Sequence, residues 1–303
     1  MITTNNATVA WMLLNTIGCK HPTSLIQGGY NMIVQHNMAS ANTNRQLGIT
    51  NSNLAKSTEK LSSGYKINRA GDNAAGLTIS EKMRGQIRGL DQASTNAQDG
   101  ISLIQTAEGA LNETQSIIQR MRELSVQAAN DTNVEADRDA IAEELSALTS
   151  EVSRIANETQ FNTMNLLTGS FTDKKLQVGA NASQSITFSI ATMNASALGI
   201  ASIASSVTSH DDATKALSTL DSALKSVSSQ RSKLGALQNR LEHTIANADN
   251  TSENLQAAES RIRDVDMARE MVKYSKDGIL QQAAQSMLAQ ANQSTQGVLS
   301  LLQ

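Results

Sequence analysis

Residues 217–262 read LSTLDSALKSVSSQRSKLGALQNRLEHTIANADNTSENLQAAESRI and repeat with a period of seven. One heptad position is apolar at every step: Leu220, Val227, Leu234, Leu241, Ala248, Leu255 and Ile262. The companion position is mixed, with polar or charged residues at four of its steps: Leu217, Leu224, Arg231, Gln238, Ile245, Ser252 and Glu259. One complete apolar row beside a mixed one predicts a single long helix packed in a bundle or coiled coil. At 1.5 Å per residue this helix would span roughly 70 Å.

The composition of the whole chain also favours long helices over a compact enzyme. Aromatic residues make up 2% of the 303 residues and hydrophobic residues 39%, whereas a large enzyme core takes much of its buried area from Phe, Tyr and Trp. The chain has a single proline, against an average usage of about 5%, so little interrupts a helix. The expected fold is mostly α, a long antiparallel helical rod of the coiled-coil type.

Charge and cysteine content exclude several functional classes. The net charge is −3 and no Lys/Arg run has interleaved aromatic residues, so nucleic acid is not an expected partner. The single Cys19 excludes an intramolecular disulfide and a multi-cysteine metal site. No stretch approaches the roughly 18 consecutive apolar residues of a membrane span, so we expect no membrane insertion.

No arrangement of side chains predicts catalysis or a cofactor. The histidines lack a His, Cys or carboxylate four residues away on a helix, as a metal pair requires; they are His21, His36, His210 and His243. Some paired carboxylates could suggest general acid–base chemistry: Asp264 with Asp266, Glu143 with Glu144, and Asp211 with Asp212. They lie on or beside long predicted helices without aromatic surroundings, so we interpret them as solvated faces or helix caps.

The first 31 residues differ from the rest of the chain. Trp11, Cys19 and Pro22 are the only residues of their types and all fall in this segment. The apolar stretch at 9–14 is short and no Lys or Arg precedes it, which is unlike a secretory signal peptide. We interpret residues 1–31 as a leader or extension outside the functional chain, which would then start at Met32.

Two further helices are expected in the N-terminal half. Helical spacing runs from Asn73 to about Ala129, with Asp72 offering an N-cap carboxylate. Its apolar stripe follows three- and four-residue steps and is interrupted by Ser94 and Glu108: Ile87, Leu90, Ala97, Ile101, Ile104 and Leu111. After Leu111 the stripe is predicted to continue with a one-residue phase shift, as Ile117, Met121, Leu124 and Ala128. After a turn at 130–133, a second helix is predicted over 134–157, with Leu145, Leu148, Val152 and Ile155 on one face.

Residues 158–210 lose the helical period. Polar residues alternate with Leu176 and Val178, and then with Ile186, Phe188 and Ile190, and residues 179–184 suit a hairpin loop. The three Phe of the chain all lie in this region: Phe161, Phe171 and Phe188. We therefore predict a small β-hairpin near 164–200 that packs against the rod through these aromatic rings.

Both ends of the main chain lack charge and carry apolar rows. Residues 278–303 contain no Asp, Glu, Lys or Arg, and residues 32–44 have no formal charge apart from His36. The residues predicted to make a self-assembly surface are Leu47, Leu54, Leu61, Leu280, Met287, Leu288, Val298, Leu301 and Leu302. An uncharged amphipathic helix is marginal in water and prone to associate. A membrane-surface helix would carry Lys and Arg on its polar face, and a poorly ordered tail is the other alternative.

Motifs at both ends and in the first predicted rod helix resemble those of bacterial flagellins. MIVQHN at 32–37 resembles a flagellin start, and LSSGYKINRAGDNAAG at 61–76 resembles the family's hinge into its rod domain. QRMREL at 119–124 resembles the motif of the first rod helix. SRI at 260–262 and LAQAN at 288–292 resemble the C-terminal signature. The chain departs from the family at Thr295, where many members have proline, and in its leader.

The resemblance implies a fold and a function. A terminal domain would pair an N-terminal helix and hinge (32–72) with a C-terminal helix (263–303), and the rod domain would span 73–262. This is the organisation of a minimal flagellin without outer domains, secreted and assembled into the extracellular filament for motility. Implied partners are further copies of the chain, an export chaperone at the C-terminal helix, and the filament cap and hook-junction proteins.

The resemblance also implies recognition by the host flagellin-sensing Toll-like receptor. Carried over by residue, Arg120 and Leu124 would be central contacts, with Gln119 in the same motif and Glu144 in support. The alternative reading from the residues places Leu124 in the helix seam and leaves Arg120 as a solvated charge. Two other functions stay open: a hook–filament junction protein, and a chemoreceptor-like signalling hairpin, which would need membrane spans and would lack the β-rich interruption.

Overall fold

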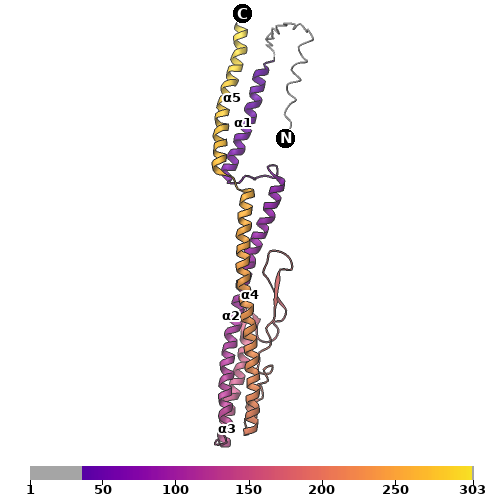
Figure 1. Ribbon diagram of the computed structural model, residues 1–303, viewed down its shortest axis with the longest axis vertical. Helices are drawn as coiled ribbons and strands as arrows, with labels where there is room; N and C mark the ends of the chain where they lie inside the picture. The colour runs from indigo at the N-terminus through magenta and orange to yellow at the C-terminus, as the bar shows by residue number, and fades with distance from the viewer. Residues whose placement is uncertain (1–35, 302–303) are drawn as a thin grey trace, which may run out of the picture. The chain divides into compact units, whose positions relative to one another are not determined.

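The structure of the protein, a computed structural model, describes residues 36–301 (Figure 1). The predicted leader at 1–31 lies outside the described residues. The long helices are α1 (Met38–Ser63), α2 (Ala74–Ala128), α3 (Glu135–Glu158), α4 (His210–Arg263) and α5 (Met267–Leu301). The short elements between α3 and α4 are β1 (Gln160–Phe161), β2 (Met164–Asn165), β3 (Lys174–Gln177), β4 (Ser185–Phe188) and the 3₁₀ turn η1 (Ile203–Ser206). The mostly helical fold with a small β element is as predicted.

The chain forms two compact units. One takes the chain up to Ser57 together with the residues from Val272 onwards, and the other is Thr58–Met271. The boundaries therefore fall inside α1 and α5. The larger unit holds the hydrophobic core, in which α2, α3 and α4 lie side by side (Figure 1).

The N-cap of α2 is Asn73 and not the predicted Asp72. Asn73 has extended backbone angles, and its side-chain oxygen accepts a 2.9 Å hydrogen bond from the Gly76 amide. The Asp72 carboxylate instead accepts bonds from the amides of Asn68 and Arg69, at 3.1 and 3.0 Å. The prediction was wrong by one residue because both side chains can accept from a backbone amide, and Asp72 closes the turn that precedes the helix.

The residues predicted to continue the apolar stripe of α2 all reach the core, with Met121, Leu124 and Ala128 buried and Ile117 half-buried. The predicted phase shift itself is absent. Leu111, Ile118 and Ser125 follow one another at steps of seven, with Thr114 and Met121 beside them, and all are buried. Thr114 and Ser125 are tolerated there because their hydroxyls donate to the carbonyls of the residues four positions earlier, each at 2.9 Å. The prediction missed this buried row because two of its members are polar residues that satisfy their hydrogen bonds within the helix.

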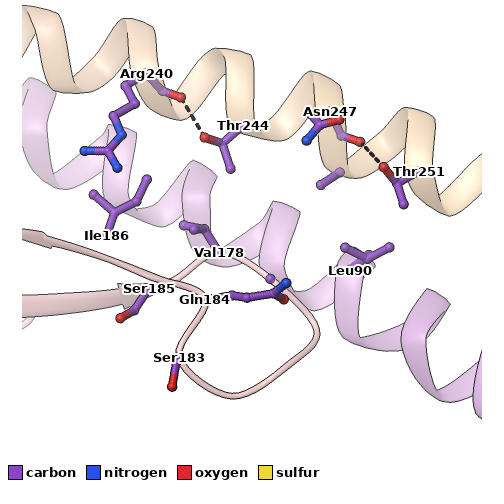
Figure 2. Close-up of a pocket in the computed structure, with 12 residues that line it drawn as sticks. Leu90, Val178, Ser183, Gln184, Ser185, Ile186, Arg240, Thr244, Asn247 and Thr251 are labelled. Carbon is purple, nitrogen blue, oxygen red and sulfur yellow. Dashed lines mark hydrogen bonds between the residues drawn. The ribbon is translucent and has the colours of Figure 1, made fainter.

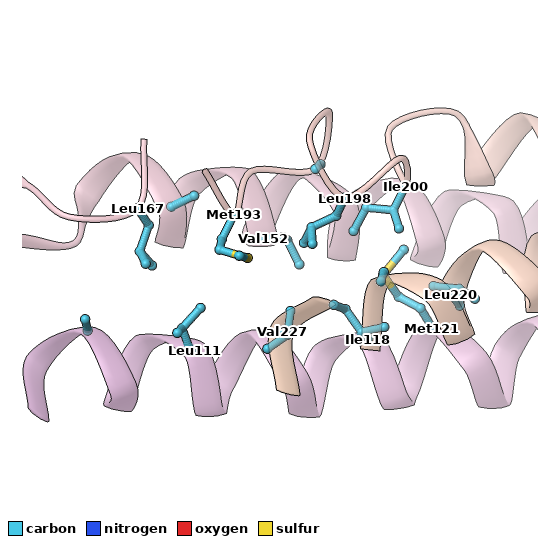
Figure 3. Packing of buried hydrophobic residues seen from close by; sticks show 14 of the residues in the cluster. Leu111, Ile118, Met121, Val152, Leu167, Met193, Leu198, Ile200, Leu220 and Val227 are labelled. Atoms are coloured by element: carbon cyan, nitrogen blue, oxygen red, sulfur yellow. The ribbon is translucent and has the colours of Figure 1, made fainter. Parts of the chain in front are cut away.

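The predicted heptad row of α4 forms the centre of the core. Its residues from Leu220 to Leu241 are fully buried, Ala248 is buried, and Leu255 and Ile262 are half-buried. The mixed companion position is half-buried along its whole length. Figure 3 shows Leu220 and Val227 of α4 meeting apolar side chains of α2 and of the segment before η1. The long packed helix predicted from residues 217–262 is confirmed.

The predicted face of α3 also packs into the core, with Leu145 and Val152 fully buried and Leu148 and Ile155 half-buried. The helix covers 135–158, one residue later at each end than predicted. The Val134 amide before the helix donates to the Asp137 carboxylate at 3.2 Å, which satisfies one of the free amides at the helix start.

The predicted hairpin is present as β3 and β4, paired antiparallel with Leu176 opposite Ile186. The Phe171 and Phe188 rings lie 5.4 Å apart and help to pack the hairpin on the rod. Leu176 packs closely against α2 at Gly100. A side chain at this position would prevent the contact, because a Cβ at Gly100 would lie 2.5 Å from a Leu176 methyl carbon. A second hairpin, β1 with β2, was not predicted.

The chain entering the larger unit meets the chain leaving it. Tyr65 pairs with Asp264 in an isolated antiparallel bridge. The Lys66 amide donates to the Arg263 carbonyl at 2.6 Å, and the Val265 amide donates to the Gly64 carbonyl at 3.0 Å. Segments almost 200 residues apart in sequence are thereby held by backbone hydrogen bonds.

Candidate assembly and recognition surfaces

The smaller unit pairs α1 with α5 through a weakly apolar inner face. The Asn37 side-chain amide donates to the Ala291 carbonyl at 2.9 Å, and the Ser40 hydroxyl donates to the Asn292 side chain at 2.7 Å. Leu47, Leu54, Ala284 and Leu288 are half-buried, while Thr50, Ser57 and Asp277 are buried. Leucines on one heptad position of α1 alternate with hydroxyl residues on the other. Such a seam contributes less apolar burial than the core of the larger unit.

Apolar side chains also project outwards from α5. We call Val272, Ile279, Leu280 and Met287 the outward row. Ile279 is 67% exposed and Met287 58% exposed. Helical spacing brings the four onto one side of α5, away from the half-buried positions 281, 284 and 288. This apolar surface is uncovered within the described residues.

The residues predicted for self-assembly lie in different environments. Leu280 and Met287 belong to the outward row. Leu47, Leu54 and Leu288 are half-buried in the smaller unit, and Leu61 is half-buried in the larger unit. The side chains of Val298, Leu301 and Leu302 lie outside the described part of the structure. Sequence reasoning missed Val272 and Ile279, although both fall seven residues apart and could have been found by extending the period.

The residues carried over as receptor contacts lie on the α2–α3 pair. Arg120 donates to one carboxylate oxygen of Glu144, from Nη2 at 3.0 Å and from Nε at 3.2 Å, and also to Glu123. The hydrogen bonds that Arg120 donates to Glu144 raise the pKa of Arg120 above its ordinary value. Gln119 is exposed beside this pair. Leu124 is only 3% exposed and lies in the core, as the alternative reading of this residue expected.

The carboxylate pairs belong to helix ends and helix faces. Ser209 caps α4 by accepting from the Asp212 amide at 3.2 Å, and its hydroxyl donates back to the Asp212 carboxylate at 2.8 Å. These contacts, with a further bond from Lys215, lower the pKa of Asp212. Asp264 follows the last turn of α4 as its C-cap. Across the described residues, no His, Cys, Asp and Glu side chains group in the numbers that a metal ion needs.

An open cavity of about 410 Å³ lies between the hairpin loop, α2 and α4 (Figure 2). Leu90, Val178 and Ile186 form its apolar wall, and hydroxyl and amide side chains cover much of the rest. Arg240 is the one cation in its lining. No acid, base or nucleophile pair faces this space. None of the described helices is both long enough and apolar enough to span a bilayer.

These observations define a helical structural protein whose end helices carry uncovered apolar side chains. Residues 34–172 match the family profile described as "Bacterial flagellin N-terminal helical region", and residues 217–302 match "Bacterial flagellin C-terminal helical region". The chain belongs to the bacterial flagellin family, whose members are structural subunits of the flagellar filament and not enzymes.

Relatives match nearly the whole described chain. A flagellin of Halalkalibacterium halodurans is 58% identical over 271 residues, which covers 89% of this chain and 100% of the relative. The flagellar filament 33 kDa core protein of Treponema phagedenis is 54% identical over 285 residues, with 89% of this chain and 100% of the relative covered. The crystal structure of Bacillus cereus flagellin has a TM-score of 0.44 at 28% identity, covering 55% of this chain and 94% of that one.

Proposed function

We propose that copies of this chain polymerise into the flagellar filament by burying the outward row of α5 against neighbouring subunits. The carrying observation is that Ile279, Leu280 and Met287 are exposed on a helix that has no charged residue from Gly278 onwards. Burying one such side chain contributes about 1.5–3 kcal/mol. Summed over the contacts with several neighbouring subunits, this burial opposes the conformational entropy cost of ordering the two chain ends. Both ends (32–72 and 263–303) would form the terminal domain and residues 73–262 the rod domain.

The same surface needs a cover before assembly. Exposed apolar rows associate non-specifically, so an export chaperone on the C-terminal helix would keep the secreted subunit from premature association. In the extracellular filament, the cap protein and the hook-junction protein would take the place of a flagellin neighbour at each end. Sequence identities above 50% to flagellins favour the bulk subunit over a hook-junction role.

Recognition by a host Toll-like receptor would involve Gln119, Arg120 and Glu144. The support is the resemblance of QRMREL at 119–124 to the family motif, together with the exposure of the three side chains and the ion pair that fixes Arg120. Arginine is common among the residues that dominate binding energy in interfaces. Leu124 would act indirectly, by holding α2 in the core.

The assembly proposal is tested with Leu280→Lys, which places a charge in the outward row. An unpaired charge in a buried contact costs several kcal/mol, so seeded growth of filaments should stop while the monomer stays folded. Gln285→Lys is the matched control, because Gln285 is exposed on the opposite side of α5 and has the same charge change. Sedimentation of both variants after the addition of seeds measures filament growth. Growth of Leu280→Lys at the rate of the control would overturn the proposal.

A further inference from the structure

A second cavity, of about 430 Å³, lies between α4 and residues 191–198. The polar side chains that α4 contributes to its lining are Lys225, Ser226, Ser229, Gln230 and Lys233. Met193 and Leu198 line it from the facing segment, and both side chains also reach the core (Figure 3). The cavity thus has an apolar back and a row of donors along one helix.

Gln230 is the unusual member of this row. Its side chain is only 4% exposed, and its Nε2 has no hydrogen-bond partner among the described residues. Buried amide donors are nearly always satisfied in native proteins. The Nε2 atom itself is buried, so an acceptor from outside the chain would reach it only after the Gln230 side chain turns toward the cavity that this residue lines.

Lys225 and Lys233 flank this donor. Both are exposed, and neither forms an ion pair with any side chain in the described structure. They are eight residues apart on α4, which places their Cα atoms about 12 Å apart along the helix axis. The site therefore presents two separated positive charges with neutral donors between them.

Helix α3 carries negative charges at the same spacing as the two lysines. Glu135, Asp139 and Glu143 follow at steps of four, so they share one side of the helix, and all three are exposed. The outer two are again eight residues apart, about 12 Å along the axis. None of the three has an ion-pair partner within residues 36–301, whereas the adjacent Asp137 and Glu144 bond to Val134 and Arg120.

We propose that Glu135, Asp139 and Glu143 of one copy dock across the cavity of a second copy, with the outer carboxylates at Lys225 and Lys233. The middle carboxylate would then stand opposite Ser229 and Gln230 and supply the missing acceptor. The proposal rests on the proposed self-assembly and names one contact within it. It joins two different surfaces of the larger unit, and a head-to-tail contact of this kind can repeat from copy to copy, as a filament requires, whereas a two-fold contact would stop at a dimer.

A charge swap tests the contact. Lys225→Glu/Lys233→Glu and Glu135→Lys/Glu143→Lys each place like charges opposite one another, which strongly disfavours association. Each pair should raise the critical concentration for seeded polymerisation about tenfold or more. The quadruple variant restores the net charge of the parent and reverses both surfaces, so its critical concentration should return to within about threefold of the parent. This recovery also shows that the substitutions permit folding.

The control is Lys174→Glu/Lys175→Glu, which has the same charge change on exposed residues of β3 in the same unit; it should polymerise like the parent. Polymerisation of Lys225→Glu/Lys233→Glu at the parent's critical concentration overturns the contact and leaves the proposed function standing. Failure of the parent to polymerise overturns the proposed function itself. If polymerisation is lost without recovery in the quadruple variant, and ³¹P NMR shows that the parent monomer binds inorganic phosphate at these lysines, the cavity is a small-anion site and the docking proposal is wrong.

Discussion

Arg231 of α4 and Glu108 of α2 form an ion pair, with 3.3 Å between Nη2 and Oε1. Nη1 of the same guanidinium donates to the Gln115 side-chain oxygen at 2.8 Å. Glu108 interrupts the apolar stripe of α2, and Arg231 is the first polar residue on the mixed heptad position of α4. These two charged residues therefore face each other. Since a polar contact inside an apolar seam disfavours sliding, we expect this pair to favour the observed axial register of α2 and α4.

Arg231→Ala should lower the free energy of unfolding by about 1–2 kcal/mol, because Glu108 and Gln115 then lose a partner in a half-buried seam. Urea unfolding of the monomer measures the loss. The matched control is Arg122→Ala, which removes another α2–α4 ion pair, at 2.9 Å to Asp221, whose partners are about half exposed. That pair should contribute about 0.5 kcal/mol or less. Equal losses in both variants would contradict a special role for Arg231.

Gly89→Ala and Gly109→Ala should have opposite effects, although both remove a glycine from α2. Alanine at 109 meets nothing within 4 Å, so helix propensity alone should stabilise the rod by about 0.5–1 kcal/mol. At Gly89 the new methyl would lie 2.8 Å from the Ala180 Cβ and 3.1 Å from its Cα, and the backbone of the hairpin loop must move. Hydrogen exchange at the Val178 amide, which donates to the Gln184 carbonyl, should be faster in Gly89→Ala. Unchanged exchange there would refute the close-contact explanation.

Acid should weaken the junction of α2 and α4. The hydrogen bond from Arg263, 2.7 Å from Nη1 to Oε1, holds the pKa of Glu81 below its ordinary value of 4.5. A carboxylate whose pKa is lower in the folded chain contributes stability above about pH 4.5 and loses it as the pH falls through the folded pKa. Melting temperatures of the parent and of Glu81→Gln should therefore differ at pH 7 and converge as the pH falls below 4.5 and through the lowered pKa of Glu81 in the folded chain. A constant difference across this range would argue against the linkage.

Arg120→Ala should weaken binding to the flagellin-sensing receptor by about tenfold or more, if this arginine is a dominant contact. Surface plasmon resonance with the monomer measures it, and circular dichroism checks that helicity is unchanged. Arg122→Ala again serves as control, since Arg122 lies two residues away on another side of α2. Equal affinity of Arg120→Ala and the parent would remove Arg120 from the site.

Leu124→Ala should act on stability and not on contact. Its side chain is buried, so truncation leaves a cavity and costs about 2–5 kcal/mol. Well below the melting temperature, receptor affinity of the folded fraction should match the parent. A large affinity loss in a fully folded sample would instead give Leu124 a direct role.

Local periodicity was sufficient to predict α4 and the β3–β4 hairpin, because each depends on side chains close in sequence. The same reasoning failed where two residues could serve one role, as with Asp72 and Asn73, and where hydroxyls bonded back to the helix, as at Thr114 and Ser125. The turn between β1 and β2 was missed because Asn162 and Thr163 take positive φ values of 47° and 64° without a glycine. The pairing of Arg231 with Glu108 depends on helix register, which one sequence does not specify.

The bonds of Lys66 with Arg263 and of Gly64 with Val265 have a topological consequence. The segment between them begins and ends at one point, with its two backbones as close as neighbouring strands of a sheet. A domain inserted into a loop of a host protein has this geometry. Because its two ends lie close together, no long linker is needed to connect it to the host. The larger unit could therefore be grafted onto a host with two adjacent antiparallel backbone ends, and joining its own two strands at this point would give a circular chain.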